Sequence, residues 1–148
     1  DAYNAAPTSM HAAIQFVEQT TIRNEKWLVL GDMLELGNEE KKMHEGIAGH
    51  IHPEEISYVC LYGPRMKWLY NKLQETFDAE HLVYSENEYA PIIEKIQSHA
   101  TNESILLVKG SRGMKLEKII HSNPSMLMSV EMLITTLLME IMRRPILY

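Results

Sequence analysis

The stretch Trp27-Leu-Val-Leu-Gly-Asp-Met-Leu-Glu-Leu-Gly37 decides the fold. It opens with four consecutive apolar residues, a pattern typical of a parallel strand that is buried on both faces. Gly31 and Gly37 then bound a turn in which Asp32 and Glu35 place carboxylates directly after the strand. The sequence therefore predicts a buried strand followed by a connection to a helix. The spacing alone leaves open whether that connection is only a turn or also part of a binding site.

Apolar runs and helical patterns alternate along the rest of the chain. One-faced helical spacing is found over residues 10–17, 43–51, 66–73 and 89–96. Further strands are expected at residues 56–62, 81–84 and 105–108. Helix followed by strand four times over predicts an α/β fold with a doubly wound, mostly parallel sheet flanked by helices, which is Rossmann-like. Ligands bind at the carboxyl ends of such strands, here the loops 31–37, 62–64, 85–87 and 109–113.

Composition narrows the class of protein. The chain has 148 residues, of which 45% are hydrophobic and 23% charged, with a formal net charge of −6. That length fits one domain with its own core, and the ordinary apolar fraction excludes a disordered chain. The acidic balance argues against nucleic-acid binding, which needs a basic face. Cys60 is the single cysteine, which excludes a disulfide scaffold and predicts a small buried side chain.

Seven histidines raise the question of a metal site. His44 and His50 are six residues apart, whereas the zinc-binding H-E-x-x-H pattern places its two ligands four apart on one helical face. His50 and His52 precede Pro53 at an expected helix end, where cations are favoured. We therefore expect capping and surface roles for these histidines, and no metal site.

The loop Lys109-Gly-Ser-Arg-Gly113 follows the last expected strand and precedes a helix that we expect to reach about Ile120. Backbone N–H groups at a helix N-terminus attract anions, and Lys109 and Arg112 add full positive charges. The loop is not a P-loop, because G-x-x-x-x-G-K-[ST] does not occur. It is either an anion-binding loop or a solvated turn with two surface cations.

The two ends of the chain differ from its middle. Residues 1–10 place an acid, an aromatic ring and an amide before a proline-started helix, which fits either a nucleotide or a plain turn and cap. The first residue is Asp1 rather than Met, so we expect a segment of a longer protein. Five of the ten methionines lie in residues 123–148, which predicts either an apolar helix that is buried or bound to a partner, or a disordered tail that pairs with another copy through residues 126–142. Residues 132–139, its longest charge-free apolar stretch, are too few to span a membrane.

Three motifs resemble those of the Mur ligases. Asp1-Ala-Tyr-Asn-Ala-Ala-Pro-Thr-Ser-Met10 is similar to the family's D-x-Y-N-A-N-P-x-S-M motif. Val29-Leu-Gly-Asp-Met-Leu-Glu-Leu-Gly37, followed by His44, is similar to the V-L-G-D-M-L-E-L-G stretch of the members that add D-alanyl-D-alanine. Leu107-Val-Lys-Gly-Ser-Arg-Gly-Met114, continuing into Leu116-Glu117, is similar to V-K-G-S-R-x-M-x-L-E. The three motifs occur in the family's order.

The resemblance implies that residues 1–122 are the third, carboxy-terminal domain of a three-domain, ATP-dependent ligase, with residues 123–148 as an added tail. Such a ligase joins D-Ala-D-Ala to UDP-MurNAc-tripeptide in peptidoglycan precursor synthesis in the bacterial cytoplasm, and so supports cell shape and division. Its central domain holds the P-loop and Mg²⁺, and its amino-terminal domain holds the UDP-sugar. The isolated domain is expected to be inactive without these two partner domains.

The resemblance also implies roles for individual residues. ATP would be held by Asp1 at the ribose, Tyr3 on the adenine and Asn4 facing the nucleotide. The dipeptide carboxylate and the acyl phosphate would be faced by Lys109, Ser111 and Arg112. Motif positions without an assigned role are Asp32, Glu35 and His44. Ala6 replaces the second asparagine of the first motif, so any contact from that amide is lost. The alternative is a stand-alone nucleotide- or anion-binding module that oligomerises through residues 126–142.

Overall fold

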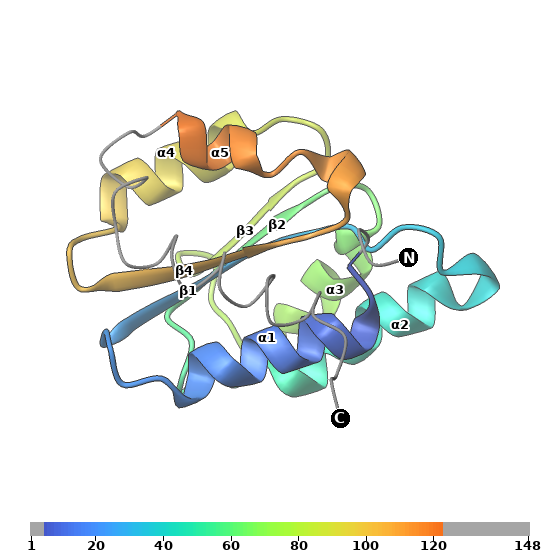
Figure 1. The fold of residues 1–148 in the computed structure, drawn as a ribbon, viewed down its shortest axis with the longest axis horizontal. Helices are drawn as coiled ribbons and strands as arrows, with labels where there is room; N and C mark the ends of the chain where they lie inside the picture. Colours follow the sequence, from blue (N-terminus) through green and yellow to red (C-terminus); the bar gives the residue numbers. More distant parts are fainter. Residues whose placement is uncertain (1–4, 123–148) are drawn as a thin grey trace, which may run out of the picture.

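Residues 5–122 are described by the computed structural model of the chain, drawn in Figure 1. Four strands form a parallel sheet in the order β3-β2-β1-β4, which confirms the predicted α/β fold. The strands are β1 (Glu25–Gly31), β2 (Tyr58–Tyr62), β3 (Leu82–Ser85) and β4 (Ser104–Lys109). Each strand therefore contains most of the apolar run that predicted it.

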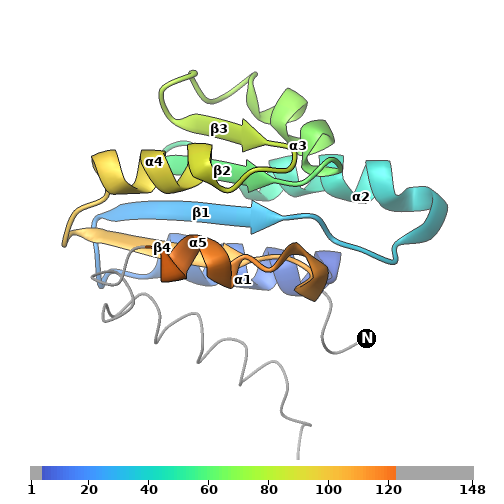
Figure 2. The same cartoon turned by 90° about the horizontal axis from the view of Figure 1, so that it is seen from above.

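Helices cover both faces of the sheet, as Figures 1 and 2 show. One face carries α1 (Pro7–Gln19), α2 (Glu40–Gly46) and α3 (Met66–Leu73), and the other carries α4 (Ala90–His99) and α5 (Glu117–His121). Short 3-10 helices lie between these elements, namely η1 (Gly37–Glu39), η2 (Ile47–His50) and η3 (Arg112–Met114). The predicted layers of helix, sheet and helix are confirmed.

The sheet is buried on both faces because successive strand residues enter different cores. Leu28 and Leu30 of β1 belong to the core under α1, α2 and α3, whereas Trp27 and Val29 belong to the core under α4 and α5. Cys60 of β2 lies in the second core, and its burial raises the pKa of the thiol to about 12. The predicted small buried side chain is confirmed, and a thiol held in its neutral form is a poor nucleophile.

The helix predicted over residues 43–51 differs from the structure. Met43 is exposed and His44 is fully buried, so the predicted apolar face is wrong at its first position. The helix α2 ends at Gly46 and continues as the 3-10 helix η2, in which Ile47 is buried as expected. The physical reason is that the His44 imidazole fills the buried position, where it bonds to backbone groups.

None of the helices between residues 5 and 122 has the length and apolar character needed to span a bilayer. Residues 123–148 lie outside the described residues, so the predicted apolar helix and the division at residue 122 stay predictions.

Candidate functional site

The loops at the carboxyl ends of the strands are joined to one another by backbone hydrogen bonds. The Asp32 N–H donates to the Tyr62 carbonyl oxygen at 3.2 Å, and the Gly63 N–H donates to that of Ser85 at 2.9 Å. On the other side, the Ser111 N–H donates to the Asp32 carbonyl oxygen at 2.9 Å. The loops after β1, β2, β3 and β4 therefore form one continuous edge, where ligands of parallel sheets bind.

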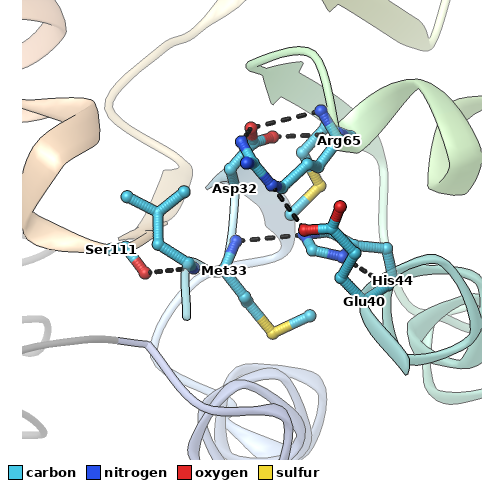
Figure 3. A network of polar contacts seen from close by, with 8 residues as sticks. Asp32, Met33, Glu40, His44, Arg65 and Ser111 are labelled. Carbon is cyan, nitrogen blue, oxygen red and sulfur yellow. Dashed lines mark hydrogen bonds and ion pairs between the residues drawn. The ribbon is translucent and has the colours of Figure 1, made fainter. Parts of the chain in front are cut away.

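Asp32 is the centre of this edge. Its side chain is fully buried, and Oδ1 accepts a hydrogen bond from the Met66 N–H at 2.9 Å. Oδ2 accepts from the Arg65 N–H at 3.1 Å and from the guanidinium Nη1 at 3.3 Å, as Figure 3 shows. A Cβ at Gly63 would lie 2.4 Å from Oδ1, so the approach of the carboxylate requires glycine there. Asp32 thus binds the first turn of α3 and contributes its charge to the fold.

Arg65 connects Asp32 to a second carboxylate. Its Nε donates to Glu40 Oε2 at 2.7 Å, and Glu40 is the first residue of α2. The hydrogen bond to Glu40 is the main cause that raises the pKa of Arg65, and the bond to Asp32 adds to it. One guanidinium therefore links the end of β1, the start of α2 and the start of α3. The sequence motifs contain neither Arg65 nor Glu40, although Arg65 directly follows the expected ligand loop 62–64.

His44 lies at the same edge, and each of its two ring nitrogens is hydrogen-bonded to a backbone group. The Met33 N–H donates to Nε2 at 3.0 Å, so Nε2 is an acceptor and the proton is on Nδ1. Nδ1 then donates to the Glu40 carbonyl oxygen at 2.6 Å. The expected surface role is wrong for His44, which is fully buried. Its Nε2 is the acceptor that the buried Met33 N–H requires.

Ser111 holds the loop after β4 against the loop after β1. Its hydroxyl oxygen accepts a hydrogen bond from the Leu34 N–H at 2.8 Å, and the residue is 1% exposed. A Cβ at Gly110 would lie 2.9 Å from the Gly31 Cα, so the two backbones are in close contact. We call the set of Asp32, Met33, Leu34, Glu40, His44, Arg65 and Ser111 the loop junction.

Lys109 is the last residue of β4 and is half-buried. Burial lowers the pKa of its ammonium group. Among residues 5–122, no acceptor lies within hydrogen-bond or ion-pair distance of Nζ. Arg112 is exposed at the start of η3.

The helix expected after Gly113 is present as α5, which reaches His121, but it begins only at Glu117. η3 and a left-handed Lys115, with φ of 50°, precede the short helix α5. The loop is therefore not followed by a long helix whose N-terminus could attract an anion, and the charge of this region comes from side chains.

The structure brings Asp32, His44 and Ser111 together and leaves Lys109 and Arg112 beside them. Glu35 is exposed in the turn after β1, with a left-handed φ of 63°. Asp1, Tyr3 and Asn4 lie outside the described residues. Within residues 5–122, no three His, Cys, Asp or Glu side chains are grouped so that they could hold a metal ion.

Comparison with known proteins agrees with these motifs. The family described as "Mur ligase, glutamate ligase domain" matches residues 1–112. The UDP-N-acetylmuramoyl-tripeptide–D-alanyl-D-alanine ligase of Bacillus subtilis is 38% identical over 120 residues, which are 81% of this chain and 26% of the relative. The enzyme of the same name from Rickettsia prowazekii is 32% identical over 124 residues, and the match again covers 81% of this chain and 26% of the relative. The chain thus spans about a quarter of the length of these relatives.

Solved structures share the fold. A crystal structure of MurF from Acinetobacter baumannii has a TM-score of 0.65 at 26% identity, covering 81% of this chain and 26% of that one. MurF from Thermotoga maritima, in complex with ADP, has a TM-score of 0.66 at 20% identity, covering 84% and 27%. The family match extends from residue 1 to the loop after β4, and the chain therefore belongs to the Mur ligase family, of which it contains the glutamate ligase domain.

Proposed function

We propose that this chain is the carboxy-terminal domain of the ATP-dependent ligase that joins D-Ala-D-Ala to UDP-MurNAc-tripeptide. The observation that carries the proposal is the 38% identity over 120 residues with a relative of that name, together with the three motifs in the family's order. The partners of the domain are then the amino-terminal and central domains of the same enzyme, and its location is the bacterial cytoplasm, where ATP and the UDP-linked precursor are found.

Lys109 is the residue best suited to bind the dipeptide. Burial makes its charge unfavourable, and no described residue offsets it. An incoming carboxylate would provide the missing partner, and Arg112 lies three residues further on with a guanidinium that matches a carboxylate geometrically. Ser111 would act differently, since its hydroxyl oxygen already accepts from Leu34. We therefore assign ligand contact to Lys109 and Arg112, and loop positioning to Ser111.

The nucleotide side of the proposal rests on residues 1–4. By resemblance, Asp1 binds the ribose hydroxyls of ATP, Tyr3 packs on the adenine and Asn4 faces the nucleotide. In the sequence these residues precede α1, whose buried residues include Met10 and Ile14. The P-loop and the Mg²⁺ site are assigned to the central domain.

In the reaction proposed, ATP phosphorylates the tripeptide carboxylate, and the amine of D-Ala-D-Ala attacks the acyl carbon. The new amide bond forms as phosphate leaves, and the amine loses a proton. The part of this domain is to hold the dipeptide by its carboxylate, which places the amine toward the acyl phosphate. The domain supplies no P-loop, so it is incomplete alone.

A chimeric enzyme tests this proposal. The last quarter of the Bacillus subtilis relative is replaced by this chain, and ADP release is measured with both substrates present. We expect ligation by the chimera and none by the chain alone. A chimera that is folded by circular dichroism but inactive contradicts the proposed substrates, and ligation by the chain alone contradicts the incompleteness.

Lys109→Met in the chimera tests the dipeptide site. We expect the KM for D-Ala-D-Ala to rise by about 10- to 100-fold, as for the loss of a hydrogen bond to a charged group, with the KM for ATP unchanged. Lys118→Met is the matched control, because Lys118 is an exposed lysine on α5. An equal effect of both substitutions would contradict the assignment.

The alternative, a stand-alone nucleotide-binding module, predicts different results. The chain alone would then bind ATP tightly in a calorimetric titration. Removing residues 123–148 would change its mass in light scattering from that of an oligomer to that of a monomer. Either result would replace the ligase proposal only if the chimera is also inactive.

A further inference from the structure

We propose that Arg65 is a positioning residue, which fixes the loop after β1 and through it the loop that carries Lys109 and Arg112. The inference rests on the proposed function for its consequence in catalysis. The structural part, that Arg65 controls the geometry of residues 109–112, is independent of any activity.

The first step is the pair of carboxylates that Arg65 connects. Nη1 bonds Asp32 at 3.3 Å and Nε bonds Glu40 at 2.7 Å, while the side chain remains 35% exposed. Asp32 begins the connection after β1 and Glu40 begins α2, so the guanidinium fixes both ends of residues 32–40. A planar guanidinium holds two carboxylates in a fixed relative geometry, which a single ammonium group does not.

The second step is the connection to the loop after β4. The same Asp32 whose carboxylate binds Arg65 accepts the Ser111 N–H through its carbonyl oxygen at 2.9 Å. The Leu34 N–H donates to the Ser111 hydroxyl oxygen at 2.8 Å. Two hydrogen bonds on either side of Met33 therefore join the loop fixed by Arg65 to Ser111.

The third step is the lack of free space between the two loops. A Cβ on Gly110 would come within 2.9 Å of the Gly31 Cα and 2.9 Å of the Leu116 side chain. Lys109 itself is paired in register with Leu30, directly before Gly31. A displacement of Asp32 is therefore transmitted to the backbone on both sides of Lys109.

The fold does not depend on Arg65 alone. Without the guanidinium, Asp32 keeps the backbone N–H donors of residue 65 and Met66. His44 continues to hold Met33 against α2. Loss of the side chain is thus expected to shift the loop rather than to unfold the domain.

The experiment combines a structural and a kinetic measurement on Arg65→Gln. In the full chain, we expect the backbone amide NMR signals of Gly110 and Ser111 to move, while signals of α4 stay in place. In the chimeric ligase, we expect the KM for D-Ala-D-Ala to rise roughly tenfold, with the KM for ATP unchanged. We expect Arg65→Lys to recover part of this loss. Lys67→Gln, which removes an exposed cation in the first turn of α3, is expected to have no effect.

Glu40→Gln separates positioning from direct contact with the dipeptide. If Arg65 acts through Glu40 and Asp32, Glu40→Gln also raises the dipeptide KM, and the double variant is no worse than Arg65→Gln alone. If Arg65 contacts the dipeptide itself, Glu40→Gln leaves the KM unchanged, and the proposal is overturned.

The failure of this inference differs from failure of the proposed function. Unchanged amide signals of Gly110 and Ser111 in Arg65→Gln overturn the inference, whatever the chimera does. Moved signals together with an inactive wild-type chimera support the control of the loop by Arg65 and reject the ligase assignment.

Discussion

The loop junction and the contact between α1 and η2 use the same residue types in different ways. In the loop junction, His44 bonds two backbone groups. The Asp32 carboxylate accepts hydrogen bonds from two backbone N–H groups, those of Arg65 and Met66, and from the Arg65 guanidinium. We call the second region, formed by His11, Glu18, His50 and His52, the α1 contact. There, the rings of His11 and His50 stack at 3.5 Å between centroids, and His52 Nδ1 lies 2.8 Å from Glu18 Oε1.

A backbone partner also occurs in the α1 contact, where the His52 N–H donates to Glu18 Oε2 at 2.8 Å, so the main difference is burial, with the His52 side chain 52% exposed. Backbone partners inside the protein fix a geometry, and an unmade bond there leaves a buried N–H without an acceptor. Side-chain partners near the surface titrate and are solvated when they separate. The loop junction is thus suited to holding a site in place, whereas the α1 contact responds to pH.

Asp32→Asn is expected to have the largest effect on stability. The amide NH₂ would face N–H donors, and Arg65 would lose one of its two carboxylates. We expect a loss of about 2–3 kcal/mol in the free energy of unfolding, measured by urea denaturation. Glu39→Gln, an exposed carboxylate next to α2, is the control and should stay close to wild type. An equal loss in both variants would show that burial of Asp32 has no special importance.

His44→Leu is expected to have the next largest effect. The Met33 N–H would lose its acceptor in a buried place, at a cost of about 2 kcal/mol in the free energy of unfolding. His44→Gln is the matched control, because its amide oxygen is able to reach the position of Nε2 and should recover part of the loss. Recovery by leucine instead would indicate that the site needs only apolar volume.

Local patterns predict the strands, because a strand buried on both faces must be apolar at every position, as β1 is from Trp27 to Leu30. They fail at α2, where the buried residue is His44 and Met43 is exposed. The role of Asp32 was also beyond local reasoning, because its donors Arg65 and Met66 lie 33 and 34 residues away. Motif reading finds such a residue, and only the tertiary structure shows what it binds.

The α1 contact predicts opposite pH responses for two histidines. The hydrogen bond with Glu18 is the main cause that raises the pKa of His52, so its stabilisation is full below about pH 6.5 and is lost as pH rises through the folded pKa. Burial is the main cause that lowers the pKa of His50, helped by His11 and His52 and opposed by Glu18. The His50 imidazole therefore binds a proton more readily in the unfolded chain than in the folded chain. Acidification below about pH 6.5 thus destabilises the fold through His50.

Melting temperatures between pH 5.5 and 7.5 measure these two contributions. The charged groups around the contact are Glu18, Lys26, Glu54 and Glu55. We expect His52→Gln to make the chain more sensitive to acid, and His50→Phe, which keeps an aromatic ring on His11, to make it less sensitive. Shifts in the same direction for both variants would contradict this account.

The smallest effect is expected for Asp78→Asn. Asp78 Oδ1 lies 2.7 Å from His81 Nδ1, which equals the 2.7 Å between Arg65 and Glu40 and is shorter than the 3.3 Å between Arg65 and Asp32, yet the Asp78 and His81 side chains are 67% and 42% exposed. The hydrogen bond with His81 is the main cause that lowers the pKa of Asp78, so any stabilisation is present above about pH 4 and is lost as pH falls through the folded pKa. Because water solvates both groups when they separate, we expect no measurable shift of the urea midpoint at pH 7. A shift as large as that of His44→Leu would show that short distance, rather than burial and backbone partners, determines what a polar contact contributes in this domain.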